Sequence, residues 1–252
     1  MIKDSTMILN QEGTLGTLRE QLACVFRWMA RLDLHEAAAN HCSVMTNYRE
    51  KKFLINPAGR HFSEIKASDL LEVAANTEAE PANIDPTAWA IHGAMHRQNR
   101  DVGCILHCHS LYATALACLD NPELPPIEQS SMRFFERFSV DHDFEGMGLG
   151  DEAERLAAMA DNRKQILLLG NHGVIAIGPD VATAFDNLYY FERACRYYLV
   201  ARASGLPLSP VSKEVARLTA EQWDDYIKMG SPQAHLAALM RVLDREESDY
   251  RS

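Results

Sequence analysis

Three histidines are placed in the sequence so that they could hold a metal ion together. His107 and His109 flank Cys108 at the end of the apolar run VGCILHCH. Side chains alternate across a strand, so the two imidazoles share one face and Cys108 faces the other. A third candidate, His172, lies in the segment Gly170-Asn171-His172-Gly173 between two apolar runs. Three imidazoles leave one coordination position open, which is typical of catalytic rather than structural metal sites.

Spacing alone leaves other interpretations of these histidines open. Asn171 and His172 are suited to forming a turn, and an isolated HxH pair occurs by chance on many surface strands. A polar pair that closes a buried strand is more informative, because strand ends hold sites in open α/β sheets. Imidazole suits zinc, iron, nickel or copper, so the ligand type does not identify the metal. His92 and His96 stand four apart on a predicted helix, but the glutamate of a protease HExxH motif is missing between them.

Helices and strands that would position the histidines alternate along the chain. The spacing of apolar residues predicts helices over residues 14–34, 86–99, 110–119, 152–162, 181–203 and 219–247. Short apolar runs predict strands over residues 43–46, 53–55, 102–109, 165–169 and 174–177, and residues 124–150 are predicted to hold two short strands and an exposed loop. Such an alternation predicts a sheet covered on its faces by helices, within a single α/β/α domain over residues 1–252.

Composition excludes several classes of function. The formal net charge of −10 argues against binding to nucleic acid, which favours basic surfaces. No run approaches the 18 or so apolar residues that a membrane span needs, and the N-terminus lacks the apolar core of a signal peptide. The six cysteines are scattered without a CxxC pair, which does not favour a disulfide framework. We therefore expect a cytoplasmic protein with no membrane partner.

The same segments resemble the class II aldolase/adducin family, and in particular its bacterial adducin-like branch. In that family an HxH pair on a strand and a later histidine before a glycine hold the metal, as Leu106–His109 and Gly170–Gly173 would here. The matching stretches cover most of the chain, and the others are Asn40-His41-Cys42-Ser43-Val44, Phe53–Gly59, and His92 with Arg100-Asp101-Val102-Gly103.

The resemblance implies a three-layer α/β/α fold with a central mixed sheet, and commonly a homotetramer with sites at subunit interfaces. It implies one divalent metal ion, with zinc as the first choice and manganese, iron or nickel as alternatives. It also implies a small anionic substrate whose phosphate or carboxylate is bound by His41, Gly59 and Thr87. From its residue type, His41 could serve an anion if it is protonated, or it could be a satisfied polar residue at the start of a strand.

One departure from the family pattern bears on the reaction. The sugar-phosphate aldolases of the family carry a proton-transferring glutamate near the start of the helix before the HxH strand, and the matching position here is Ala88. An alanine cannot move a proton, so sugar-phosphate aldolase activity is in doubt. Asp85 and Glu128 are candidate replacement bases, although Asp85 could also be an acidic residue that starts the helix beside Pro86.

A polar and aromatic segment, EQSSMRFFERFSVDHDF, offers further candidates for binding the substrate. Arg133 could form paired hydrogen bonds with a carboxylate, and Gln129 could contribute beside it. The alternatives are a solvated arginine or one that pairs at an interface.

Three functions remain open from the sequence. The leading hypothesis is a metal-dependent carbon–carbon lyase, of aldolase or decarboxylase type, that acts on a small hydroxy, keto or aromatic acid. The second is an adducin-like scaffold without catalysis, against which the complete set of candidate ligands argues. The third is a non-haem iron oxygenase, whose usual ligands are two histidines and one carboxylate.

Overall fold

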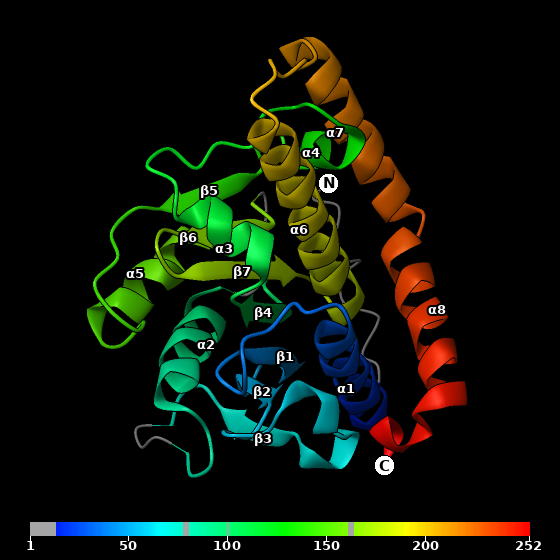
Figure 1. The fold of residues 1–252 in the computed structure, drawn as a ribbon. Coiled ribbons are helices and arrows are strands. Elements are labelled where there is room, and N and C mark those ends of the chain that lie inside the picture. Colours follow the sequence, from blue (N-terminus) through cyan, green and yellow to red (C-terminus); the bar gives the residue numbers. More distant parts are fainter. Residues whose placement is uncertain (1–13, 78–80, 100, 161–163) are drawn as a thin grey trace, which may run out of the picture.

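A computed structural model describes residues 14–77, 81–99, 101–160 and 164–252. Within them, seven strands form one sheet in the order β3-β2-β1-β4-β7-β6-β5, which Figure 1 shows from bottom to top. Neighbouring strands are antiparallel except β5 and β6, which are parallel. The expected mixed sheet is therefore confirmed. The strands are β1 (His41–Asn47), β2 (Lys52–Ile55), β3 (Leu71–Ala74), β4 (Cys104–Cys108), β5 (Phe138–Asp141), β6 (Ile166–Leu169) and β7 (Gly173–Gly178).

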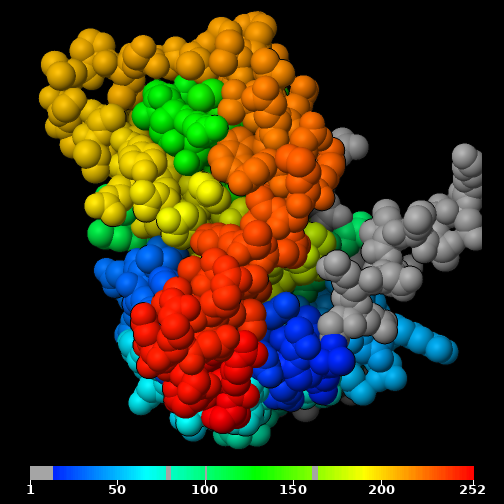
Figure 2. Space-filling view, turned by 90° about the vertical axis from the view of Figure 1, so that its right-hand side faces the viewer, coloured from blue at the N-terminus to red at the C-terminus, as the bar shows by residue number. Residues whose placement is uncertain are grey.

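Helices cover both faces of this sheet. The first face is covered by α1, α3 and α6, and the second by α2 and α5. Outside the first layer, α8 packs against α6 and α1, and Figure 2 shows α7 and α8 as a band along that side of the molecule. The helices are α1 (Leu15–Arg31), α2 (Pro86–Gln98), α3 (Leu111–Ala117), α4 (Gln129–Arg133), α5 (Asp151–Met159), α6 (Val181–Ala203), α7 (Lys213–Lys228) and α8 (Ser231–Glu246).

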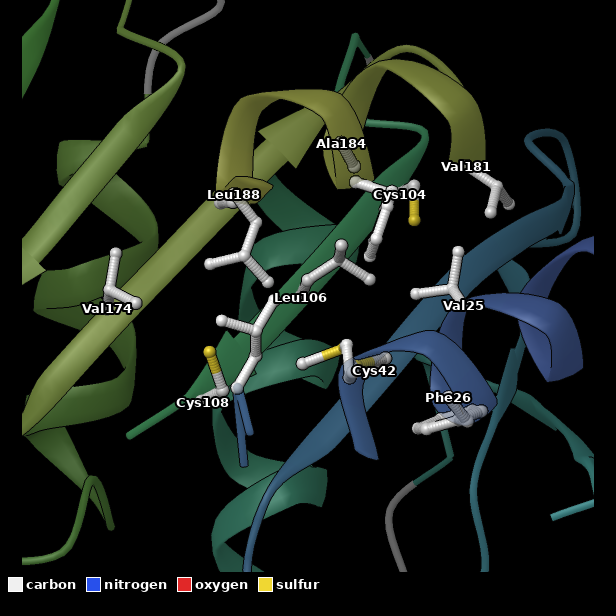
Figure 3. Close-up of a cluster of buried hydrophobic side chains, with 14 of the residues drawn as sticks. Val25, Phe26, Cys42, Cys104, Leu106, Cys108, Val174, Val181, Ala184 and Leu188 are labelled. Carbon is white, nitrogen blue, oxygen red and sulfur yellow. Dashed lines mark hydrogen bonds between the residues drawn. The ribbon is translucent and has the colours of Figure 1, made fainter. Parts of the chain in front are cut away.

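Strand alternation divides the sheet side chains between an apolar face and a face that carries polar groups. Cys42, Leu106 and Cys108 point toward α1 and α6 and belong to the main core, as Figure 3 shows. Their neighbours in sequence point the other way, toward α2 and α5. His41 and His107 are direct cross-strand partners on that second face. The register between β1 and β4 therefore decides that these two imidazoles are neighbours.

Three sequence predictions differ from the structure. Residues 219–247 belong to two helices, because Gly230 adopts a φ of +91° and Pro232 follows in the first turn of α8. Residues 124–150 hold one strand, β5, and the short helix α4 instead of two strands. Strand β3 was not predicted, because it is only four residues long and its burial is only partial. The predicted helix end at residue 162 and the family match at residue 100 lie outside the described residues.

The described residues contain no helix with both the length and the apolar character needed to cross a membrane.

Candidate metal centre

The fold brings together the three histidines that the sequence singled out. His107 is on β4, His109 follows that strand directly, and His172 lies in the turn between β6 and β7. The ring centroids are 4.9 Å apart for His107 and His172, 5.0 Å for His109 and His172, and 5.2 Å for the HxH pair. One ligand nitrogen from each ring lies within 4.8 Å of the other two. Residues 65 positions apart in the sequence thus form a single cluster of donor atoms.

Backbone geometry at the β6–β7 turn allows His172 to approach the HxH pair. Asn171 adopts a left-handed φ of +56°, which asparagine tolerates better than most residues. A β-carbon on Gly173 would lie 2.7 Å from the carbonyl oxygen of Cys108 and 2.8 Å from the His109 ring. Only glycine fits at this position without displacing the end of β4, as the sequence suggested.

Hydrogen bonds orient two of the three imidazoles. Nδ1 of His107 lies 3.1 Å from the carbonyl oxygen of Val174, and a carbonyl can only accept, so this nitrogen carries the proton. Nδ1 of His109 lies 2.6 Å from a carboxylate oxygen of Glu36. In both rings Nε2 is left as the metal-binding nitrogen. Glu36 lies in the loop between α1 and β1, and no motif in the sequence marks it.

Burial keeps the imidazoles of His107 and His172 in the form that binds metals. Burial lowers the pKa of His107 well below its ordinary range, and the nearby rings of His41 and His172 lower it further. Burial and the neighbouring His109 also lower the pKa of His172. Neutral imidazole is the ligand that a cation requires. Three imidazole nitrogens that converge on one point fit a divalent ion such as zinc.

A chain of buried polar side chains leads away from the cluster along the second face of the sheet. His41, the cross-strand partner of His107, has Nδ1 2.8 Å from Nε2 of His92. Ser43 Oγ then lies 2.5 Å from Nδ1 of His92 and 2.8 Å from Nε2 of His96. His92 and His96, which stand four residues apart on α2, thus pack against β1. His92 also holds the His41 ring in place.

Of the two interpretations of His41, the structure favours a neutral, hydrogen-bonded residue over a protonated one. Burial is the main cause that lowers the pKa of His41 well below its ordinary range, and the adjacent His92 adds to it. His41 is therefore neutral at neutral pH and cannot attract an anion as a cation. It can still offer a hydrogen bond through Nε2, because Nδ1 is already engaged by His92.

Acidification should destabilise the fold through the buried His96. Burial lowers the pKa of His96 from 6.5 to about 3. Between these two pH values, His96 therefore binds a proton in the unfolded chain but not in the folded chain. The stability present above pH 6.5 should therefore fall by about 1.4 kcal/mol per pH unit for this group as the pH drops toward 3. Urea unfolding between pH 7 and pH 5 measures the slope. His96→Gln should reduce the slope by an amount that corresponds to about one bound proton. An unchanged slope would contradict the low pKa of His96.

The candidate base Asp85 is engaged in capping a helix. Its carboxylate accepts hydrogen bonds from the backbone N–H groups of Thr87, at 2.9 Å, and Ala88, at 3.3 Å, at the start of α2. The Thr87 hydroxyl donates to the same oxygen. Asp85 therefore acts as the N-cap of α2, and it engages both the backbone N–H and the hydroxyl of Thr87. Gly59, at a φ of +71°, lies exposed in the loop after β2.

The other polar candidates, from residues 128–133, lie in or next to α4 and bond to neighbouring parts of the chain. Glu128 is the N-cap of α4, and its carboxylate accepts from the backbone N–H groups of Ser130 and Ser131. The Gln129 carbonyl accepts from the indole N–H of Trp223. Arg133 is fully buried, with its guanidinium 2.7 Å from Asp186 and 2.6 Å from Asn187. Within this chain, Glu128 and Arg133 therefore have structural partners, and we do not carry them forward as base and carboxylate ligand.

Removing the Arg133 side chain should cost stability. Arg133→Leu leaves the Asp186 carboxylate, which is 4% exposed, without its guanidinium. We expect the free energy of unfolding to fall by about 3–5 kcal/mol, as when one partner of a buried ion pair is removed. Urea denaturation measures the loss. The double change Arg133→Leu with Asp186→Leu should recover most of it, and a single variant as stable as wild type would refute this role.

Comparison with known proteins finds a matching family model and several relatives. The sequence model for the Class II Aldolase and Adducin N-terminal domain matches residues 20–199. Decarboxylase NovR of Streptomyces niveus is 31% identical over 239 residues, which cover 90% of this chain and 86% of that protein. A 4-hydroxy-3-prenylphenylpyruvate oxygenase/4-hydroxy-3-prenylbenzoate synthase of Streptomyces roseochromogenus subsp. oscitans is 30% identical over 215 residues, covering 83% and 76%.

Among solved structures, an aldolase II superfamily protein from Pseudomonas syringae superposes with a TM-score of 0.85 at 30% identity. The match covers 94% of this chain and 96% of that chain. The arrangement of strands and helices described above is therefore shared over nearly the whole length of both proteins.

Proposed function

Because the chain belongs to the class II aldolase and adducin family, we propose that it is a metal-dependent lyase that breaks a carbon–carbon bond in a small hydroxy, keto or aromatic acid. The observation that carries this proposal is the cluster of three imidazoles whose ligand nitrogens lie within 4.8 Å of one another. A scaffold protein has no chemical need for such a cluster with an open coordination position.

His107, His109 and His172 would hold one divalent cation through nitrogen. Zinc is our first choice, because three neutral imidazoles and one open position describe many catalytic zinc sites. Manganese, iron and nickel are the alternatives. Bound there, the cation would act as a Lewis acid and draw electron density from substrate oxygens as the carbon–carbon bond breaks.

His41 is the residue to which we assign a direct contact with the substrate. It is neutral, it lies beside His107 with ring centroids 4.7 Å apart, and its Nδ1 is engaged by His92. In the tautomer that we propose, Nδ1 accepts from His92 and Nε2–H donates a hydrogen bond to a substrate oxygen on which negative charge develops. A neutral imidazole is suited to this role, because it donates without first being charged.

Decarboxylation fits the described residues better than aldol cleavage does. Aldol cleavage begins when a base removes a hydroxyl proton, and the family's glutamate position is Ala88, while Asp85 caps α2. Loss of carbon dioxide needs no base at its start: the bond to the carboxyl carbon breaks, its electron pair remains on the substrate carbon, and a proton from water completes the product. The relative named decarboxylase NovR supports this choice.

A substrate screen tests the proposal. The zinc-loaded protein would be incubated with hydroxy acids, keto acids and aromatic acids, while carbon dioxide and carbonyl products are measured separately. We expect carbon dioxide from at least one acid and no aldol cleavage of sugar phosphates. Efficient cleavage of a sugar phosphate would contradict the decarboxylase assignment, and inactivity of metal-loaded protein on every acid class would contradict the lyase assignment.

A second candidate is an iron-dependent oxygenase, because one relative carries oxygenase in its name. The cluster found among the described residues consists of three histidines, without the carboxylate of the usual oxygenase set. Oxygen uptake in the presence of ferrous iron and an aromatic acid separates the two. Uptake that matches product formation would favour the oxygenase.

For the surroundings of the site we propose a small anionic substrate, a homotetramer and a cytoplasmic location. We propose that Gly59 contacts the anionic group through its backbone N–H, whereas the backbone N–H and the hydroxyl of Thr87 already donate to Asp85. We propose no partner of the nucleic-acid class, since the net charge is −10.

A further inference from the structure

The carboxylate of Glu36 is in contact with the candidate metal centre. One of its oxygens lies 2.6 Å from Nδ1 of His109. We propose that Glu36 is a positioning residue, which fixes the ring orientation and tautomer of His109 so that Nε2 faces His107 and His172. This inference rests on the proposed metal site, and it concerns a residue that belongs to none of the family motifs described above.

The loop that carries Glu36 is built to hold one conformation. Asp33 and Ala37, on either side of Glu36, adopt left-handed φ values of +56° and +47°. Such values are uncommon for residues other than glycine, and they persist where the surroundings fix the backbone. A loop of this length with two such residues has few alternative ways to present the Glu36 side chain.

Asn40 joins this loop to the end of β4. Its side-chain oxygen accepts from the backbone N–H of Glu36 at 2.6 Å and from the backbone N–H of His109 at 3.4 Å. Asn40 is itself buried, and its carbonyl accepts from the Asn56 side chain at 3.3 Å. The side-chain amide oxygen of Asn40 therefore holds the backbones of Glu36 and His109 at fixed positions.

The two members of the HxH pair depend on this support to different degrees. His107 is inside β4, 2% exposed, and oriented by a backbone carbonyl of the neighbouring strand. His109 lies one residue beyond the end of β4, and 21% of its side chain is exposed. Without a partner at Nδ1, its ring could rotate or take the other tautomer. Glu36 thus supports His109, the member of the HxH pair that the sheet holds less firmly.

Glu36 should matter little for folding. Its side chain is 66% exposed, and an exposed pair of this kind adds little stability. A carboxylate behind a metal-ligating histidine, by contrast, orients the ring and raises its basicity. The effect of Glu36 should therefore appear in metal affinity while the unfolding of the metal-free protein stays the same.

Zinc titration of the full chain, in competition with a coloured chelator, tests the proposal. We expect Glu36→Ala to weaken zinc binding by about 10–100-fold, the usual loss when such a partner is removed. Glu36→Gln keeps a hydrogen-bond acceptor but loses the charge, so its zinc affinity should lie between those of wild type and Glu36→Ala. Glu221→Gln makes the same change of charge at an exposed position on α7 and should bind zinc as wild type does.

Nitrogen NMR of labelled histidines in the metal-free protein provides a readout without metal. His109 should be the Nδ1–H tautomer in wild type and a mixture of tautomers in Glu36→Ala. Equal zinc affinity of wild type and Glu36→Ala would overturn the role of Glu36 and leave the metal site standing. Failure of the wild-type chain to bind zinc, manganese, iron or nickel would overturn both proposals.

Discussion

Replacing His109 by alanine is expected to lower turnover by at least about a thousandfold, because loss of a ligand removes Lewis-acid stabilisation worth several kcal/mol. His109 supplies one of the three nitrogens that lie within 4.8 Å of one another. Its side chain is partly exposed at the end of β4, so its loss should leave the core packing intact. The measurement is the rate of product formation by the metal-supplied variant, with circular dichroism to check folding.

A histidine far from the cluster serves as the matched control. His235 on α8 bonds to Asp186 and contributes to the support around Arg133. His235→Ala also removes one imidazole, but it should leave turnover per folded molecule unchanged. Wild-type turnover in folded His109→Ala would contradict the mechanism, whatever metal the protein carries.

Replacing His41 by phenylalanine is expected to lower kcat by about 10²–10³, as the loss of one hydrogen-bond donor to a developing oxyanion does elsewhere. The aromatic ring preserves the volume next to His107, where the two ring centroids are 4.7 Å apart. Only the hydrogen bond at Nε2 and the contact with His92 are lost. Zinc content should stay that of wild type, because His41 lies outside the ligand set.

The conservative variant separates a chemical role of His41 from a packing role. His41→Gln retains an N–H donor and should recover part of the lost kcat, whereas His41→Phe should not. If both variants keep wild-type kcat, then His41 does not contact the reacting atoms. If both lose zinc, then the effect runs through His107 and the proposed hydrogen bond to the substrate is wrong.

Much of this arrangement could be predicted from local sequence patterns. The HxH pair at the end of a buried strand predicts two imidazoles on one face, because alternation along a strand is strictly periodic. The glycines around His172 predict a close turn, and the structure shows that Gly173 leaves no room for a β-carbon. The long helices were predicted because their apolar residues recur at helical spacing.

Other features depended on contacts that local patterns do not encode. Glu36 and His109 are 73 residues apart, and only the register of β1 against β4 brings their segments together. Arg133 reads as a substrate ligand in the sequence, but its partner Asp186 lies on a helix 53 residues later. The pKa of His41 follows from burial against α2, which the residue type cannot reveal.

The central claim is that His107, His109 and His172 bind one metal ion, and elemental analysis of the purified chain tests it most directly. The protein would be supplied with zinc, freed of unbound metal and analysed by mass spectrometry beside His109→Ala. We predict one zinc per wild-type chain and a clear loss in the variant. A wild-type chain that retains no divalent metal, or a folded variant that retains as much as wild type, would contradict it.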